Sequence, residues 1–401
     1  MNRRRFNQRN IALFGIVIGL VIASSARAQE LQIGTGESPL FEGEQLLLNG
    51  SYAAAADIFQ MADGLDRNEG IDGASRAFFM MGNSSEAINV TEQLIGEDAY
   101  ADFPLVSTQL AEVKRAIGRA TEALEILNAV VDGVSEPPVR TLVQYGSLLK
   151  FLGRRTEAEE VLNLAVQRYN NGLVFASEDV AMVALASWLL DNFHDANSLF
   201  SEATRANPNN LEAQVLWGDL FLEKYNANDA QRSYQEVLDI NSRHVPALVG
   251  MAKVGGDERS LTRALAINPN SVLALETYGQ LLLINNREAE AQEYFDRALN
   301  LNPQSLKSLS ILAAQAALNQ RDEEYEKHKA QVDSFSPDNP QFLGDIADTF
   351  GNNYLFSEAV EFARAAINSD PEYWQGYTPV SYTHLRAHET DSYLVCRLLL
   401  E

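Results

Sequence analysis

The chain has 401 residues and carries 55 acidic against 31 basic side chains, a formal net charge of −24. A surface this acidic repels nucleic acid and anionic lipid headgroups, which excludes both as expected partners. The only cysteine, Cys396, lies close to the end of the chain, and a single cysteine excludes an intrachain disulfide framework.

Residues 1–28 have the pattern of a secretory signal peptide. A basic start containing Arg3, Arg4 and Arg5 precedes the apolar run 11–23, and Ala26-Arg27-Ala28 supplies the small residues that a signal peptidase recognises. The apolar run is too short to span a bilayer, and no later segment is apolar enough to do so. We expect cleavage before Gln29, a linker over residues 29–39, and export of the mature chain to a bacterial periplasm or beyond the cell.

A phrase recurs further along the chain. Arg-Ala-Leu-x-(Ile/Leu)-Asn-Pro occurs twice between Arg263 and Pro303, which places Pro269 and Pro303 34 residues apart. Small and apolar residues recur in many segments at i, i+4 and i+7, the spacing of one helix face. Small residues also recur in the segments that precede these sets, and prolines follow several of the sets. The recurring sets are Ala55/Phe59/Ala62, Ala87/Thr91/Leu94, Ala123/Leu127/Val130, Ala158/Leu162/Ala165, Ala196/Phe200/Ala203, Ala230/Tyr234/Val237, Ala291/Phe295/Ala298 and Ala359/Ala363/Ala366.

A period of this length with paired amphipathic segments resembles the tetratricopeptide repeat (TPR), a helix-turn-helix unit. The resemblance implies an all-α solenoid, a right-handed superhelix of about ten repeats over residues 40–378. The segment from His244 to Leu261 is short by about two helical turns, and Tyr325 and Lys329 stand where an alanine and an aromatic residue are expected. An irregular all-helical bundle is the alternative.

The end of the chain has a different character. From Val380 onward the residues resemble one translated frame of a sequencing-library adapter, so we expect residues 379–401 to be non-biological read-through. The segment from Asp370 to Tyr377 looks like the start of another unit, so the solenoid is expected to be truncated at its C-terminal end. Without the two ends, 24 basic and 52 acidic residues remain, and the net charge is near −28.

Catalytic motifs are missing from the sequence. Outside the tail the histidines are His194, His244 and His328, and none has the spacing of a metal ligand set. No nucleophile elbow, phosphate-binding loop or dinucleotide-binding phrase stands on a strand-to-helix turn. We therefore expect a non-enzymatic chain without a cofactor or a metal ion.

Partner binding in this architecture is expected on the concave face, which first-helix residues line. An apolar stripe there predicts a groove for a peptide or a partner helix. Packing of the same side chains between adjacent helices is the alternative. The residues of this predicted groove are Leu48, Phe79, Met80, Phe151, Trp188, Leu189, Leu222 and Ile284.

Two classes of function follow from this sequence. The first is an interaction scaffold of the bacterial cell envelope that binds a protein or peptide partner. The second is the N-terminal TPR portion of a larger exported enzyme, for example a peptidase, whose catalytic domain is missing. A metal-ligand motif in the uninterrupted gene would indicate the second class.

Overall fold

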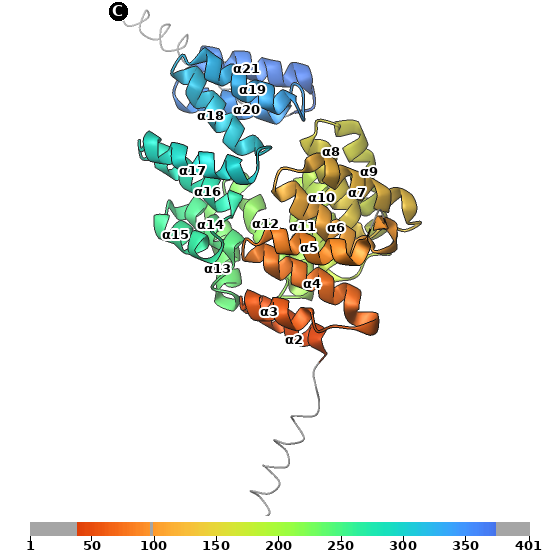
Figure 1. Cartoon of the computed structure of the whole chain (residues 1–401). Helices are drawn as coiled ribbons and strands as arrows, with labels where there is room; N and C mark the ends of the chain where they lie inside the picture. Colours follow the sequence, from red (N-terminus) through yellow and green to blue (C-terminus); the bar gives the residue numbers. More distant parts are fainter. Residues whose placement is uncertain (1–37, 97–98, 374–401) are drawn as a thin grey trace, which may run out of the picture.

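The computed structural model describes residues 38–96 and 99–373 (Figure 1). The predicted signal peptide, nearly all of the predicted linker and the adapter-like segment 379–401 lie outside these residues. Their assignments therefore stay predictions. The first described helix begins at Pro39, beside the predicted linker boundary.

Within the described residues, 20 α-helices form ten consecutive pairs and no strand occurs, which confirms the predicted all-α solenoid. Two short 3₁₀ helices, η1 (Gly64–Asp66) and η2 (Tyr100–Asp102), lie in the loops after the first and second pairs. The pairs are α2 (Pro39–Leu48) with α3 (Tyr52–Phe59), α4 (Arg67–Met80) with α5 (Ser84–Ile95), α6 (Pro104–Ala116) with α7 (Ala120–Gly133), α8 (Val139–Phe151) with α9 (Arg155–Asn170), α10 (Ser177–Leu189) with α11 (Phe193–Ala206), α12 (Leu211–Glu223) with α13 (Ala227–Ile240), α14 (Val245–Gly255) with α15 (Glu258–Ile267), α16 (Val272–Ile284) with α17 (Glu288–Leu301), α18 (Leu306–Leu318) with α19 (Asp322–Asp333), and α20 (Pro340–Asn352) with α21 (Phe356–Ser369).

The recurring small and aromatic residues form the contacts inside each pair. In the eighth pair Ala291 and Ala298 are fully buried, and Phe295 between them is 1% exposed. A Cβ built on Gly279 of α16 would lie 2.7 Å from the Phe295 ring, so only glycine admits the ring at that point. The predicted register of the second helices is therefore confirmed in this unit.

The two units that depart from the repeat pattern, α14 with α15 and α18 with α19, lie where the sequence predicts them. The pair α14 and α15 has 11 and 10 residues, whereas most helices of the solenoid have 13 or 14. In α19 only Val332 is buried, and Tyr325 packs edge-on against Phe362 of α21 at a centroid distance of 6.2 Å. A second helix with so small a buried face depends on its neighbours for its position.

The turns between the helices of a pair share one backbone form. At these corners the second residue after the first helix usually has a positive φ, as at Gly82 (82°) and Asn286 (58°). The next amide closes the turn by bonding back into the last turn of the helix, as Asn83 N does to Phe78 O at 2.9 Å. Such a corner reverses the chain within two or three residues.

The solenoid curves until its two halves touch, edge against edge. Figure 1 shows α3 beside the end of α13, far away in the sequence. There the Tyr52 hydroxyl donates to the carbonyl of Arg243 (3.2 Å), and the Arg243 side chain donates to the carbonyl of Gly50 (3.1 Å). Corners of early pairs therefore lie on loops that follow late second helices.

The same contact recurs three more times along the two edges. Asn270 donates to the carbonyl of Gly82 (2.9 Å), the amide of Ala120 donates to Gln304 (3.0 Å), and Asn339 donates to the carbonyl of Phe151 (3.2 Å). We call this line of contacts the seam. It joins the corners after α2, α4, α6 and α8 to the loops before α14, α16, α18 and α20.

Candidate interaction surfaces

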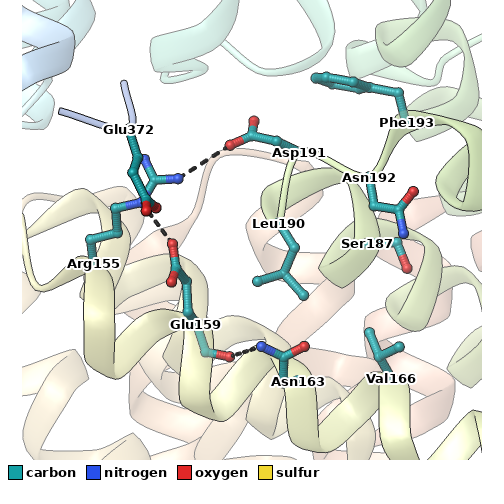
Figure 2. A pocket seen from close by; sticks show the side chains of 10 residues that line it. All are labelled: Arg155, Glu159, Asn163, Val166, Ser187, Leu190, Asp191, Asn192, Phe193 and Glu372. Atoms are coloured by element: carbon teal, nitrogen blue, oxygen red, sulfur yellow. Dashed lines mark hydrogen bonds and ion pairs between the residues drawn. The ribbon is translucent and has the colours of Figure 1, made fainter. Parts of the chain in front are cut away.

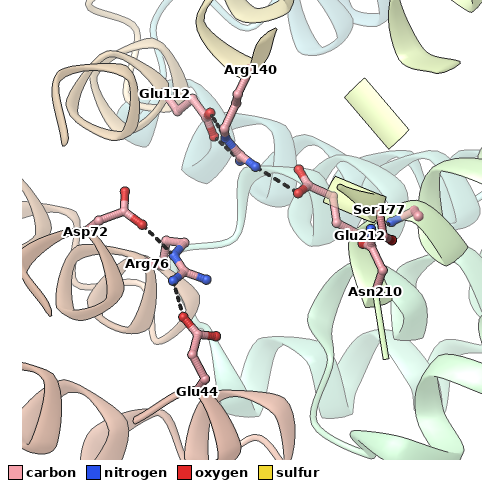
Figure 3. A network of polar contacts seen from close by, with 9 residues as sticks. Glu44, Asp72, Arg76, Glu112, Arg140, Ser177, Asn210 and Glu212 are labelled. Atoms are coloured by element: carbon pink, nitrogen blue, oxygen red, sulfur yellow. Dashed lines mark hydrogen bonds and ion pairs between the residues drawn. The ribbon is translucent and has the colours of Figure 1, made fainter. Parts of the chain in front are cut away.

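Charged side chains from several first helices point toward one another inside the solenoid (Figure 3). Arg140 of α8 donates from Nε to Glu112 of α6 (2.7 Å) and from Nη1 to Glu212 of α12 (2.8 Å). Arg76 of α4 pairs with Asp72 (3.0 Å) and with Glu44 of α2 (2.5 Å). The inner side of the first six pairs is thus lined by ion pairs that link different units.

Neighbouring charges hold this network in its ionised form. Burial alone would lower the pKa of Arg140, but the carboxylates of Glu112 and Glu212 outweigh it and raise that pKa well above its usual value. Burial would raise the pKa of Glu212, yet Arg140 and Arg76 lower it overall. Removal of one partner would therefore leave an uncompensated charge, although solvent screens it in part because the side chains of Arg140 and Glu212 are 28% and 46% exposed.

His244 lies at the edge of this network, at the start of α14. Its Nδ1 accepts from the amide of Ala247 (3.4 Å) and caps the helix, and the residue is 7% exposed. Burial lowers the pKa of His244 to about 4, although nearby Glu212 acts in the opposite direction. The neutral imidazole is the form that this position accepts.

Two inner cations bond to neutral groups. Arg115 of α6 donates to the hydroxyl of Ser147 (3.0 Å) and lies 5.6 Å from the ring centroid of Phe151, while Lys150 of α8 donates to the carbonyl of Leu189. Burial lowers the pKa of Arg115 and of Lys150. These two side chains place positive charge on α6 and α8, with Glu112 near Arg115 and Asp191 near Lys150.

The last described pair has the opposite electrostatic character. Burial raises the pKa of Asp345 on α20, where Lys307 is 3.8 Å away. The pKa of Asp348, one turn further along, rises to about 6 because of burial and the neighbouring Asp345. The first helices of the solenoid therefore present basic groups near α6 and α8 and acidic groups near α20.

A cleft of about 690 Å³ lies between α9, the corner after α10 and Glu372 (Figure 2). Arg155 is placed at its edge by several carboxylates: Glu159 (2.7 Å), Asp370 (2.9 Å), Asp191 (3.4 Å) and Glu372 (3.4 Å). Leu190 and Val166 supply apolar wall on the other side. Because Arg155 already pairs with these acids, the described residues that line the cleft offer no free cation to an anionic ligand.

The structure distributes the residues of the predicted groove over different surroundings. Phe79 and Met80 line a cleft of about 800 Å³ along the seam, beside Asn268 and Leu273. Leu48 is half-buried at the end of α2. These three residues lie near the corner edge of the solenoid.

Four others contact other parts of the same chain, and for Trp188 the contact is with an adjacent first helix, as in the alternative interpretation. Phe151 stacks on Phe335 across the seam with ring centroids 5.5 Å apart. Trp188 donates from its indole nitrogen to Glu223 (2.8 Å). Leu189 packs on the cluster around α10, and Leu222 packs on the cluster around Tyr234. The role of the predicted groove in partner binding stays a prediction.

Ile284, the eighth residue, belongs to a different surface. It is 76% exposed next to the corner after α16, and Tyr225 (96%) and Tyr354 (77%) are exposed at the corners after α12 and α20. We call the corners of the last five pairs the free corner edge, because no seam loop covers them in the described part of the chain. Sequence reasoning missed both tyrosines, although a tyrosine at a turn position that favours glycine is a visible signal.

Two further features, a metal site and a membrane-spanning helix, are not found in the described residues. Between Ser38 and Tyr373, apart from residues 97–98, no group of three or more His, Asp or Glu side chains is arranged to hold a metal ion. No helix in that part of the chain combines the length and the apolarity that crossing a bilayer requires.

Comparison with known proteins agrees with the repeat geometry. The family described as tetratricopeptide repeat matches residues 139–171 and 274–305, which are the fourth pair and most of the eighth. The crystal structure of the APC/C hetero-tetramer Cut9-Hcn1 is similar with a TM-score of 0.52 and 13% identity, over 84% of this chain and 68% of that chain. No curated protein matches the sequence. The chain therefore contains tetratricopeptide repeats and folds as a TPR-like helical solenoid.

Proposed function

We propose that the protein is a non-enzymatic interaction scaffold of the bacterial cell envelope and that it binds a protein or peptide partner. Tetratricopeptide repeats and the solenoid fold support a scaffold in general terms. The observation that carries the proposal for this chain is the free corner edge, where Tyr225, Ile284 and Tyr354 are each more than 75% exposed. These three side chains stand at alternate corners of one edge, after α12, α16 and α20, and exposed large side chains along an edge are typical of a surface that another protein covers.

The exposed tyrosines have the properties of interface residues and contribute little to the packing of the chain itself. Tyrosine offers a large apolar area and one hydroxyl at a low entropic cost, and it is enriched at protein interfaces. Tyr225 and Tyr354 have φ values of 58° and 62°, a backbone region that is costly for a tyrosine. Neither ring is part of the hydrophobic core of the described residues. Tyr225 is almost fully exposed, and Tyr354 packs only edge-on against Phe356.

A photo-crosslinking experiment tests this surface. A photoreactive amino acid replaces Ile284 in the full chain, expressed with its N-terminal segment in a bacterial host that carries the native partner set. The matched control places the same amino acid at Arg232 of α13, whose side chain is 71% exposed on a second helix. We expect a discrete adduct from position 284 and none from position 232. Equal labelling at both positions, or none at position 284, would contradict the proposed surface.

Export is a separate part of the proposal and has its own test. The basic start, the apolar run 11–23 and Ala26-Arg27-Ala28 support a cleaved signal peptide. Intact-mass analysis of the protein from a periplasmic extract should show a chain that begins at Gln29. An unprocessed chain recovered from the cytoplasmic fraction would count against export.

A further inference from the structure

The four seam corners differ in sequence from the other corners of the solenoid. Their left-handed residues are all glycine: Gly50, Gly82, Gly118 and Gly153. At the other corners the equivalent residues, with Gly256 as the exception, carry side chains in the same left-handed region, at a φ of 55° to 62° against 77° to 82° at the seam glycines: Asp191 (61°), Tyr225 (58°), Asn286 (58°), Gln320 (55°) and Tyr354 (62°). The turn itself therefore tolerates a side chain, and backbone conformation alone does not explain the glycines.

The seam explains them. A Cβ built on Gly118 would lie 2.7 Å from Oδ1 of Asn302, and Cβ atoms on Gly50 and Gly82 would come still closer to Oδ1 of Asn241 and Asn268. A Cβ on Gly153 would lie 3.3 Å from Oγ of Ser336. At Gly256, which faces no seam loop, the nearest such contact is 3.8 Å away, at Leu281. Glycine stands where the opposite edge of the solenoid approaches the corner.

The asparagines on the other side of the seam have two roles. Oδ1 of Asn268 accepts from the amide of Asn270 (3.0 Å) and fixes the loop, while its Nδ2 donates to the carbonyl of Phe79 (3.3 Å) at the end of α4. Asn241 acts in the same way toward Arg243 and Leu47. The side chains thus supply a second donor to helix-end carbonyls that already accept from a corner amide, Gly50 N to Leu47 O (3.1 Å) and Gly82 N to Phe79 O (2.9 Å).

The seam is separate from the packing that holds the helix pairs together. Every substantial helix-to-helix contact in the described chain joins neighbours along the solenoid, within the same pair or an adjacent one. The seam instead joins segments that are 184 to 194 residues apart, through loops, backbone carbonyls and one aromatic stack. In a solenoid whose stability comes from neighbouring units, such a contact can open while every helix pair stays folded.

We propose that the seam is a latch: the chain opens along it into an extended superhelix with all helices intact, and closure of the latch restricts access to the charged inner face. Both edges are matched to each other, glycine corners on one side and asparagine loops on the other. The corners of the free corner edge, which all carry side chains except at Gly256, are not suited to receive the same loops.

Steric variants of the corners test the latch. In the full chain, Gly82→Asn and Gly118→Asn together place side chains against Asn268 and Asn302. Asparagine is tolerated in the left-handed region, as Asn286 shows with a φ of 58° at an equivalent corner. The matched control is Gln320→Asn, at a corner with a φ of 55° that no seam loop covers in the described chain. Small-angle X-ray scattering should show a larger radius of gyration at an unchanged monomer mass for the double variant, with unchanged helicity by circular dichroism, and no change for the control.

A second pair of variants removes the bonds without adding bulk. Asn241→Ala and Asn268→Ala together remove the two seam asparagines whose Nδ2 atoms donate to the carbonyls of Leu47 and Phe79. Asn207→Ala is the control because Asn207 makes the same turn, with its Oδ1 accepting from Asn209 N (3.0 Å), at a loop outside the seam. We expect an increased radius of gyration for the first variant only. Unchanged scattering from both seam variants would overturn the proposal. So would a loss of helix that accompanies the expansion, because the seam would then be part of the folded core and not a latch.

Discussion

His244 should make the stability of the solenoid depend on pH in a predictable direction. Its ordinary pKa of 6.5 falls to about 4 in the folded chain because the imidazole is buried. As the pH falls, the unfolded chain therefore binds the proton first, and the free energy of unfolding decreases. The stabilising effect is complete above pH 6.5 and is lost between pH 6.5 and 4. A difference of about 2.5 between the two pKa values corresponds to a free energy of between about 3 and 4 kcal/mol, at about 1.4 kcal/mol per pKa unit.

The substitution His244→Asn isolates this contribution. Asparagine keeps the helix cap, since Asn210 and Asn339 cap α12 and α20 by accepting from the amides of Ala213 (3.0 Å) and Phe342 (2.9 Å). It does not titrate in this range, so the variant should lose less stability than the wild type as the pH falls.

Urea unfolding followed by circular dichroism, from about pH 7.5 to about pH 4.5, measures the effect. The difference between the two proteins should change by up to about 3 kcal/mol over that range in favour of His244→Asn. The exposed His194 provides the control, and His194→Asn should follow the wild-type profile. Parallel profiles for wild type and His244→Asn would refute the assignment of acid sensitivity to His244.

Three further predictions concern packing, a buried hydrogen bond and the end of the chain. Ala298→Leu should lower the free energy of unfolding by about 1 to 3 kcal/mol, because it overpacks the contact between α16 and α17. In thermal denaturation the control Ala330→Leu, on the exposed face of α19, should be nearly neutral. Equal effects of the two substitutions would mean that the assigned register is wrong. Tyr234→Phe should lower the free energy of unfolding by about 1.5 to 3 kcal/mol, because the Tyr234 hydroxyl donates to Asp219 (2.7 Å) and Asp219 would lose that donor. Tyr225→Phe at the exposed corner is the control. A loss of stability in both variants in chemical denaturation would point to a general effect of hydroxyl loss. Deletion of residues 379–401 should leave helicity and melting temperature unchanged if the segment is read-through, and loss of folding on deletion would show that it is native.

The local architecture could be predicted because it depends on residues that are only a few positions apart in the sequence. Sets such as Ala291/Phe295/Ala298 fix one helix face, and the prolines that follow α11, α15, α17, α19 and α21 mark the ends of five second helices. The structure has ten pairs, as expected, and the prolines Pro269 and Pro303 directly follow the asparagines that end α15 and α17. The shortness of the unit around α14 could also be measured by counting residues.

The contacts between distant units could not be predicted in this way. Arg140 and Glu212 belong to the fourth and sixth pairs, and Gly118 meets Asn302 from the other half of the chain, so the curvature of the whole solenoid decides whether they meet. Curvature is the sum of small rotations at each unit, which no single window of sequence contains. The same reason explains why Phe151, expected in an open groove, stacks on Phe335. In retrospect the glycine corners of the first four pairs carried a signal of close approach.

Disulfide trapping across the seam tests the closure of the solenoid most directly. The Cβ position of Gly153 lies 3.3 Å from Oγ of Ser336, which is close enough for a bridge. In a background with Cys396→Ser, the pair Gly153→Cys and Ser336→Cys should form an intramolecular disulfide under mild oxidation of the folded chain. The pair Gly172→Cys and Ser336→Cys should stay reduced, because a Cβ on Gly172 has no neighbour within 4 Å. Two free thiols in a folded chain that carries the first pair would contradict a closed solenoid.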